Sequence, residues 1–547
     1  MWDWLCTRSG KPSAISKRWR RPRVLLRIEA LESRVVPAID ILVTTELDAV
    51  NEGSLRDAIE QANALTDNTA IIRFADHVHN IQLSSALPVL QKVDEIDGPG
   101  SGSLTIRRAP DATEAFRIFT IAGPNPITES NTVLIKGVTI TGGKTPDGEG
   151  SVGDGGGVRS AATLLRLRDV VITNNTARRG GGLITWGNLE VSDSTISGNV
   201  ASDSGGGIFY GGDRLEISNT KIRDNTAGRI REGLYGLEGV GDGGGVFIDN
   251  QRTGQAIFDH PEYKIENTEI SGNKAYRHGG GIARHTWGGA EQANGKFTLD
   301  RCTIDGNSTV TGSGGGVWTD AGGLISQCTI DGNKSARGGA GVHIAANRLF
   351  FTPASLAAVT LTSNKEQESK YGPWTLSWEK SVPAVVAGLY IEELPVADNP
   401  VFQLTVGADL VNSVIAGNDG TDVLGRQGTG GYNFIADGSK AGNPWNQNTD
   451  KTGTAQAPLD PKLVPLADNG GPTRTRLPSQ GSPLIDKGGG LGVIIRRVLC
   501  RDRSTRGGLC APGRRSRRHR GRRGPAAAEE GQGPDVGRRE RRRYPAG

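Results

Sequence analysis

The sequence predicts an all-β fold, a right-handed parallel β-helix, in which short strands stack coil upon coil. The main observation is a four-residue unit (an aliphatic residue, two variable residues and an asparagine) that occurs eight times between Val170 and Asn418. The units are Ile172–Asn175, Ile196–Asn199, Ile222–Asn225, Ile270–Asn273, Ile304–Asn307, Ile330–Asn333, Leu361–Asn364 and Ile415–Asn418. A glycine run and a further aliphatic residue usually follow, as in Gly205–Ile208. This self-similarity indicates a stacked array, because one repeat cannot bury its apolar face alone whereas neighbouring repeats can cover it.

Each repeat is predicted to contain strands because its apolar positions alternate with polar ones. We call the aliphatic residue that opens each unit its anchor. A second aliphatic residue precedes every anchor by five positions: Leu167, Val191, Ile217, Ile265, Leu299, Ile325, Leu356 and Leu410. The residue directly before the anchor is free to be polar, as in Lys221, Glu269 and Thr303. Side chains alternate between the two faces of a strand, so the anchors should form one interior column and Thr303 should face outward.

The spacing of the repeats fits three short strands per coil. The intervals between successive asparagines are 24, 26, 48, 34, 26, 31 and 54 residues. A coil of 24 residues is too short for two stacked helices and lacks the spacing of a helical apolar face. The long intervals predict either coils that carry insertions or additional coils of divergent sequence.

Asparagine and glycine are the residues expected at the corners of such coils. Asparagine tolerates the left-handed backbone region, and amides stacked about 4.8 Å apart can hydrogen-bond along a column. We therefore predict a structural ladder, rather than a ligand site, for Asn175, Asn199, Asn225, Asn273, Asn307 and Asn333. The glycine runs supply positive φ. They do not form a phosphate-binding loop, because Gly143-Lys144-Thr145 lacks the upstream glycine of that motif.

Charge is distributed unevenly along the chain. Residues 1–38 carry nine Lys and Arg against three Asp and Glu, and residues 491–547 carry seventeen against five. Residues 39–490 carry 38 against 51, so the predicted folded body is acidic, which argues against nucleic-acid binding by it. No run of eighteen apolar residues predicts a transmembrane helix.

The five cysteines have no zinc-binding spacing. Cys302 and Cys328 precede consecutive anchors by two positions, at a place where the other repeats have small or β-branched residues. Adjacent coils would bring this pair within disulfide range. Two buried free thiols are the alternative, and the sequence leaves both open.

A short helix is predicted near the start of the folded region. Ser54 and Asp57 have the spacing of a capping box, and Leu55, Ala58 and Ile59 share one helical face. An open β-helix end exposes strand edges that invite pairing with other chains. We expect the helix to cover that end.

Three further segments resemble parts of known bacterial proteins. Residues 30–38 resemble the Leu-Glu-x-Arg-x-x-Pro-Ala motif of exported planctomycete proteins, and Ser54–Ile59 resembles the opening of secreted right-handed β-helix proteins. The repeats are similar to those of chlamydial polymorphic outer-membrane proteins. Residues 460–486 resemble the "choice-of-anchor" segment that closes many such surface proteins. The resemblance implies a secreted or surface-attached, adhesive β-helix (the pectin lyase-like fold) without an established common chemistry.

The sequence thus predicts four regions. A basic, disordered export segment covers residues 1–38, the β-helix covers 39–445, the closing segment covers 446–490 and an arginine-rich disordered tail covers 491–547. The tail contains no Lys, Asn, Phe or Trp, which departs from the family. Exclusive use of arginine favours a frameshifted or mispredicted terminus over a nucleic-acid-binding arm.

Two functional hypotheses of different class follow. The preferred one is a non-catalytic secreted or cell-surface protein, expected to be a monomer without a cofactor, that binds glycans or a cell-surface partner. The alternative is a carbohydrate-active enzyme, a polysaccharide lyase or glycoside hydrolase acting on acidic polysaccharide, with a face built from insertions at 228–262 and 346–410. An enzyme should show a groove with convergent carboxylates and a basic residue, and calcium could assist it.

Asp305 and Asp331 are the weak catalytic candidates. They occupy matching positions in consecutive repeats, where stacked carboxylates could bind a cation or raise one another's pKa. Aspartate is also a common turn residue, which is the structural alternative. His278, His285 and His343 lie near glycine corners without ligand spacing between them, so these histidines do not indicate a metal site, and whether the chain binds a metal stays open.

Overall fold

The computed structural model describes residues 38–489 except 51–52, 67, 125–129, 147, 149–151, 234–235, 251–260, 287–294, 346–353, 368–385, 393–406 and 447. The chain divides into two compact units, Met1–Ile494 and Ile495–Gly547. Only the first contains described residues. The predicted export motif, apart from Ala38, and the predictions for the arginine-rich tail lie outside the described residues.

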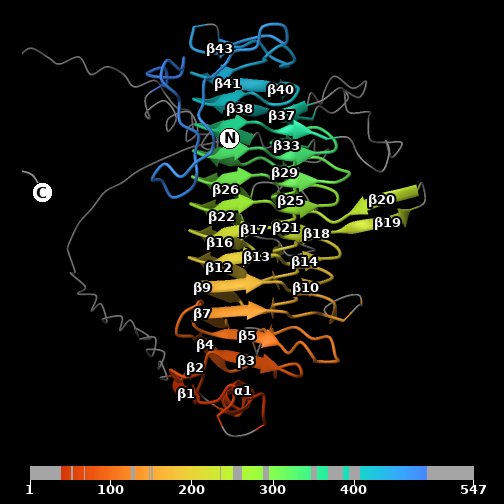
Figure 1. Ribbon diagram of the computed structural model, residues 1–547, viewed down its shortest axis with the longest axis vertical. Coiled ribbons are helices and arrows are strands. Elements are labelled where there is room, and N and C mark those ends of the chain that lie inside the picture. The colour runs from red at the N-terminus through yellow and green to blue at the C-terminus, as the bar shows by residue number, and fades with distance from the viewer. Residues whose placement is uncertain are drawn as a thin grey trace, which may run out of the picture. The chain divides into compact units, whose positions relative to one another are not determined.

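The described strands form a parallel β-helix with three sheets, as predicted (Figure 1). Sheet A has 24 strands, sheet B has 10 and sheet C has 7. Sheet A contains two parallel ladders that share β7 (Thr132–Thr141) and β9 (Leu164–Thr173), because these longer strands cross from one ladder to the other. Each coil therefore contributes two adjacent strands to sheet A.

The other strands of sheet A, in chain order, are β1 (Ile39–Val43), β2 (Ala70–Phe74), β3 (Asn80–Leu83), β4 (Val93–Asp97), β5 (Thr105–Arg108), β12 (Asn188–Ser192), β13 (Thr195–Ser197), β16 (Arg214–Ser218), β17 (Lys221–Arg223), β22 (Glu262–Glu266), β23 (Glu269–Ser271), β26 (Lys296–Asp300), β27 (Thr303–Asp305), β30 (Leu324–Ser326), β31 (Thr329–Asp331), β34 (Ala354–Ala357), β35 (Thr360–Thr362), β38 (Ala408–Val411), β39 (Val414–Ala416), β41 (Gln427–Gly431), β42 (Phe434–Ile435) and β43 (Lys451–Thr452).

Sheet B comprises β6 (Phe119–Ile121), β8 (Val158–Ser160), β11 (Leu183–Thr185), β15 (Ile208–Tyr210), β21 (Val246–Asn250), β25 (Ile282–Thr286), β29 (Val317–Thr319), β33 (Val342–Ile344), β37 (Val386–Ile391) and β40 (Thr421–Leu424). Sheet C comprises β10 (Thr176–Ala177), β14 (Val200–Ala201), β18 (Thr226–Ala227), β24 (Lys274–Ala275), β28 (Ser308–Thr309), β32 (Lys334–Ser335) and β36 (Lys365–Glu366).

The eight anchors stack in one interior column, which confirms the predicted register. Each anchor pairs in parallel with the next one along the chain, and all eight are buried. The column continues through Ile140 on one side and Ile435 on the other. The aliphatic residues five positions earlier form a second column in the same way.

The asparagine ladder runs through all eight repeats. The amide Nδ2 of Asn175 donates to Oδ1 of Asn199 at 3.0 Å, and the same bond recurs at 2.9–3.0 Å up to Asn418. The left-handed backbone, however, belongs to the preceding residue, such as Asn174 or Gly198, and not to the ladder asparagines. The sequence argument from left-handed tolerance was therefore wrong, and amide hydrogen bonding is the reason for asparagine.

The long intervals contain insertions rather than additional coils. Ile222 pairs directly with Ile270, and Leu361 pairs directly with Ile415. The first interval holds an antiparallel hairpin, β19 (Arg229–Gly233) with β20 (Gly236–Val240), which projects from the coils (Figure 1). Most of the second interval lies outside the described residues.

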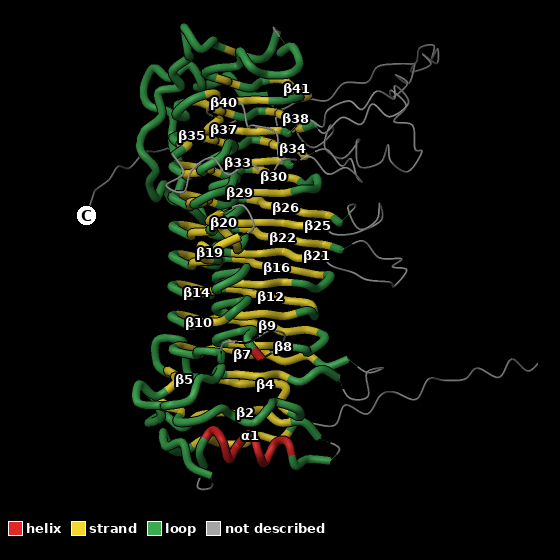
Figure 2. The backbone as a smooth tube through the Cα atoms, turned by 90° about the vertical axis from the view of Figure 1, so that its right-hand side faces the viewer, coloured by secondary structure: helices red, strands yellow, loops and turns green. Residues whose placement is uncertain are grey.

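The N-terminal helix covers one end of the β-helix, as Figure 2 shows. Helix α1 (Leu55–Asn63) buries Leu55, Ala58 and Ile59, and the Ser54 hydroxyl accepts a hydrogen bond from the Asp57 amide. The Asp57 carboxylate accepts from Gly53 N–H rather than from the Ser54 amide, so the capping box is offset by one residue. Within the described ranges, no helix has the length and apolar character needed to cross a membrane.

Cys302 and Cys328 are buried free thiols. Cys302 N–H donates to Sγ of Cys328 at 3.4 Å. Of the two alternatives, the structure has the one in which the cysteines pack as small apolar side chains.

Candidate functional site

The closing segment folds back over the acidic stack that the sequence offered as a catalytic candidate. Asp305 and Asp331 are neighbours in register on β27 and β31. Arg474 Nη2 lies 2.8 Å from both Asp305 Oδ1 and Glu269 Oε1, and Arg476 donates to Asp331 Oδ2 at 3.1 Å. The carboxylates are thus ion-paired within the chain. This geometry supports a structural role, in which they hold the closing segment against sheet A.

The same contact corrects the expectation that Thr303 faces solvent. Thr303 is 0% exposed, and its hydroxyl donates to the carbonyl oxygen of Arg474. Thr473 in turn donates to the carbonyl oxygen of Arg301 at 3.1 Å. The side chain points away from the coil interior as predicted, but a segment about 170 residues later covers it. Parallel pairing also continues to β43, past the predicted β-helix boundary at residue 445.

Three histidines that are far apart in the sequence come together on the outward face of sheet B. Ser313 Oγ lies 3.1 Å from His278 Nδ1 and 2.5 Å from His343 Nδ1. His285 Nε2 lies 3.1 Å from Asp242 Oδ2. The rings of His278 and His285 pack against Trp318, with centroids 5.1 and 4.3 Å away.

Burial and one ion pair set the charge of this cluster. Burial alone would raise the pKa of Asp242, but Arg277 and His285 outweigh it and hold the pKa well below its usual value. Burial lowers the pKa of His278 well below its usual value, and lowers that of His343 to about 3. His278 and His343 are therefore neutral at pH 7. Ser313 is also buried, and its hydroxyl lies within hydrogen-bond distance of two histidines, so this geometry supports a packing role.

A column of mostly aromatic side chains runs along this face. In-register residues of seven successive strands contribute to it: Ile184, Phe209, Phe247, Ala283, Trp318, His343 and Tyr390. Most of them are buried, whereas Trp186 beside the column is 41% exposed. Phe209 supports the Trp186 ring at a centroid distance of 6.4 Å.

This face was not predicted from the sequence, although the sequence contains a signal for it. The glycine runs are in register, since Gly205 N–H donates to the Asp242 carbonyl and Gly243 N–H donates to the His278 carbonyl. The residues that directly precede each glycine run therefore form one column, as the asparagines do. The second residues of the strands that follow the runs form another column. Aligning the repeats on their glycines, rather than on their asparagines, would have placed Asp242 next to His278.

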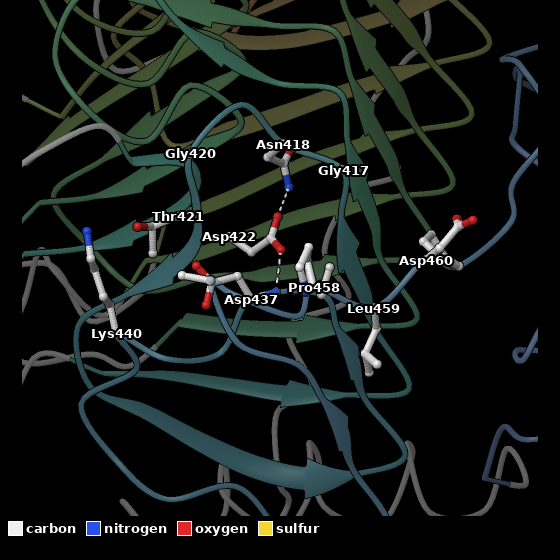
Figure 3. A pocket seen from close by; sticks show the side chains of 13 residues that line it. Gly417, Asn418, Gly420, Thr421, Asp422, Asp437, Lys440, Pro458, Leu459 and Asp460 are labelled. Carbon is white, nitrogen blue, oxygen red and sulfur yellow. Dashed lines mark hydrogen bonds between the residues drawn. The ribbon is translucent and has the colours of Figure 1, made fainter.

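A second polar site is a cavity of about 560 Å³ near the C-terminal end of the β-helix (Figure 3). Asp422, Asp437, Lys440 and Asp460 line it together with Leu459 and other apolar residues. Asp422 accepts from Asn418 Nδ2 at 2.7 Å and from Asp437 N–H at 2.7 Å. Burial raises the pKa of Asp422 to about 6, against these two hydrogen bonds and with help from the Asp437 charge.

The described residues contain no group of three or more His, Cys, Asp or Glu side chains arranged to hold a metal ion. Comparison of the chain with models of known protein families and with curated protein sequences gives no match. The function is therefore inferred from the geometry of these sites and from the fold.

Proposed function

We propose that this protein is a secreted or cell-surface β-helix protein that binds glycans through the outward face of sheet B without cleaving them. The resemblance of its N-terminal motif, repeats and closing segment to exported surface proteins supports the location. The fold is compatible with both surface binding and carbohydrate chemistry, since function depends on the site and not on the architecture.

The exposed ring of Trp186 is the observation that carries this proposal. A flat aromatic face is an apolar surface that suits the C–H groups of a pyranose ring, and nearby polar groups fix the orientation of such a ligand. Gly211 of the next coil allows the ring to lie across it, because a Cβ at Gly211 would be 2.8 Å from Trp186 Cδ1. The Trp186 ring, which we call the platform, is therefore supported by backbone and by Phe209. Glycan binding need not immobilise this side chain.

A glycan array tests the proposal. We expect the purified full-length protein to bind a subset of immobilised glycans, and Trp186→Ala to lose that binding while remaining folded, as its circular dichroism spectrum would show. Tyr432→Ala is the matched control, because it removes another exposed ring, 38% accessible, next to sheet A. Absence of glycan binding by the wild-type protein, or equal binding by Trp186→Ala, would contradict the proposal.

The cavity around Asp422 favours the second candidate, a polysaccharide lyase or glycoside hydrolase. It has convergent carboxylates and a lysine, and a carboxyl group with a pKa of about 6 can donate or accept a proton near neutral pH. Incubation with acidic polysaccharides, with and without calcium, tests for unsaturated or hydrolysed products. If the protein forms such products and Asp422→Asn abolishes their formation, the enzymatic function would replace the proposed binding function.

A further inference from the structure

The Trp186 platform lies within a cluster of arginines. The guanidinium carbons of Arg159 and Arg179 lie 5.8 and 5.7 Å from the Trp186 ring centroid. Arg159 occupies the outward position of β8, in register with Ile184 on β11. Arg117 approaches from the coil before, where its Nη2 donates to the Val152 carbonyl at 2.7 Å.

The nearby carboxylates interact with Arg179 and with its neighbour Arg178. Asp154 is fully buried and accepts from Arg178 at 3.0 Å and from Arg179 at 2.8 Å. Asp203 lies 3.8 Å from Arg178, and the charge of Asp249 also acts on Arg179. None of these acids is within ion-pair distance of Arg159 in the described part of the chain.

Among the described residues, therefore, no carboxylate forms an ion pair with Arg159, which is half-buried. Its Nε is buried and has no hydrogen-bond partner. Burial is the larger cause, and repulsion from Arg159 the second, that lowers the pKa of Arg117. The two guanidinium groups are therefore close enough to repel each other. A cluster of this kind on an otherwise acidic body is stabilised when an anion binds, because the anion offsets the repulsion between the guanidinium groups.

We infer that Trp186 and Arg159 form a subsite for an acidic sugar unit, one carrying a carboxylate or a sulfate. The inference rests on the proposed glycan binding and adds the class of ligand. The sugar ring packs on the part of the indole that is exposed to solvent, and its anionic group takes the position beside the Arg159 guanidinium. A guanidinium presents paired N–H donors that match a carboxylate or sulfate.

The test uses an array that pairs neutral glycans with carboxylated and with sulfated forms of the same backbone. We expect the full-length protein to bind the acidic forms at least about tenfold more tightly than the neutral ones, which is the ratio expected for one charge-assisted contact. Arg159→Gln should remove this preference and spare binding of neutral forms. The carboxylated and sulfated arms distinguish the two sources of the anion.

Arg214→Gln is the matched control, because it removes the same charge from the exposed outward face of sheet A. It should leave the preference intact. A protein that binds neutral and acidic forms equally, or whose preference survives Arg159→Gln, would overturn the inference while leaving glycan binding in place. Failure to bind any glycan would instead contradict the proposed function. Polyglutamate that binds as tightly as the acidic glycans would also overturn the inference, because it would show that charge alone suffices without the sugar ring.

Discussion

The outward faces of sheets A and B have the same parallel backbone but opposite surface chemistry. Sheet A carries exposed ion pairs, such as Arg166 with Glu190 at 2.7 Å and Lys296 with Glu262 at 3.0 Å. The outward face of sheet B carries buried aromatic rings and neutral histidines, and a fully buried aspartate, Asp242, lies beside it. Exposed pairs contribute little to stability, whereas a buried carboxylate must be paired to be tolerated at all.

This difference shows where in the molecule particular side chains are required and where they can be exchanged. Any Lys, Arg or Glu with a long side chain can satisfy the solvated face of sheet A, so its residues are interchangeable. On sheet B several polar groups depend on a particular partner, as His343 depends on Ser313. Around Asp305 and Asp331, where the closing segment covers sheet A, the polar side chains are paired and shielded as they are on sheet B.

The largest effect is expected when a charge enters the interior beneath sheet A. Ile222→Asp should destabilise the protein by about 4 kcal/mol, since the buried carboxylate has no partner in the anchor column. Arg223→Asp, the adjacent outward position, should change the free energy of unfolding by less than about 0.5 kcal/mol, because it is exposed and its cross-strand neighbours are Ser197 and Ser271. Urea unfolding measures both. Equal losses would refute the assigned register.

Removal of a carboxylate charge from each face tests the comparison directly. Asp242→Asn should cost about 3 kcal/mol, because it leaves Arg277, His285 and the His278 amide facing an amide group instead of a carboxylate. Glu190→Gln on sheet A should cost less than about 0.5 kcal/mol. Similar costs for the two variants would show that the two faces do not differ as described.

The pH dependence of stability should expose the neutral histidine of sheet B. The folded pKa of His343 is about 3, below the unfolded value of about 6.5. The unfolded state therefore binds more protons between these values, and this contribution to stability falls as the pH falls from 6.5 toward 3. Between pH 7 and pH 5, wild-type protein should lose about 2 kcal/mol more than His343→Asn does. Parallel profiles for the two proteins would show that His343 is not held neutral by the fold.

The smallest effect concerns the contact between the closing segment and sheet A. Arg476→Ala should destabilise the protein by about 1–2 kcal/mol, because the Arg476–Asp331 pair is mostly shielded from solvent and the substitution leaves the Asp331 carboxylate without Arg476. Arg214→Ala, which breaks an exposed pair with Glu216 on the same sheet, should cost less than about 0.5 kcal/mol. If the cost of Arg476→Ala matched that of Arg214→Ala, the closing segment would not be held by these arginines.

The repeat determined much of this structure without help from tertiary contacts. Residues one coil apart stack in register, so a period read from the sequence fixes the anchor column and identifies Asn175 and its counterparts as a ladder. The capping role of Ser54 is also local, since it depends on residues three positions apart. Such features follow from spacing alone because every coil repeats the same short-range geometry.

Other features were decided only by the folded chain. Arg284 occupies an inward position of sheet B, in register between Ile248 and Thr319, where apolar residues are expected. Its guanidinium donates to the carbonyl oxygens of Gly322 at 2.7 Å and Gly295 at 3.1 Å, which the sequence pattern does not predict. The burial of Thr303 likewise depends on Arg474, and no local pattern links the two.

The candidate sites belong to this second class. Sequence alone could offer Asp305 and Asp331 as stacked carboxylates, but it could not show that Arg474 and Arg476 neutralise them. Nor could it show that Trp186 lies beside Arg159, because the two come from different coils and meet only through the register of sheet B. A repeat specifies what is the same in every coil. Function depends on the positions at which the coils differ, and the stacked structure is what brings those positions together.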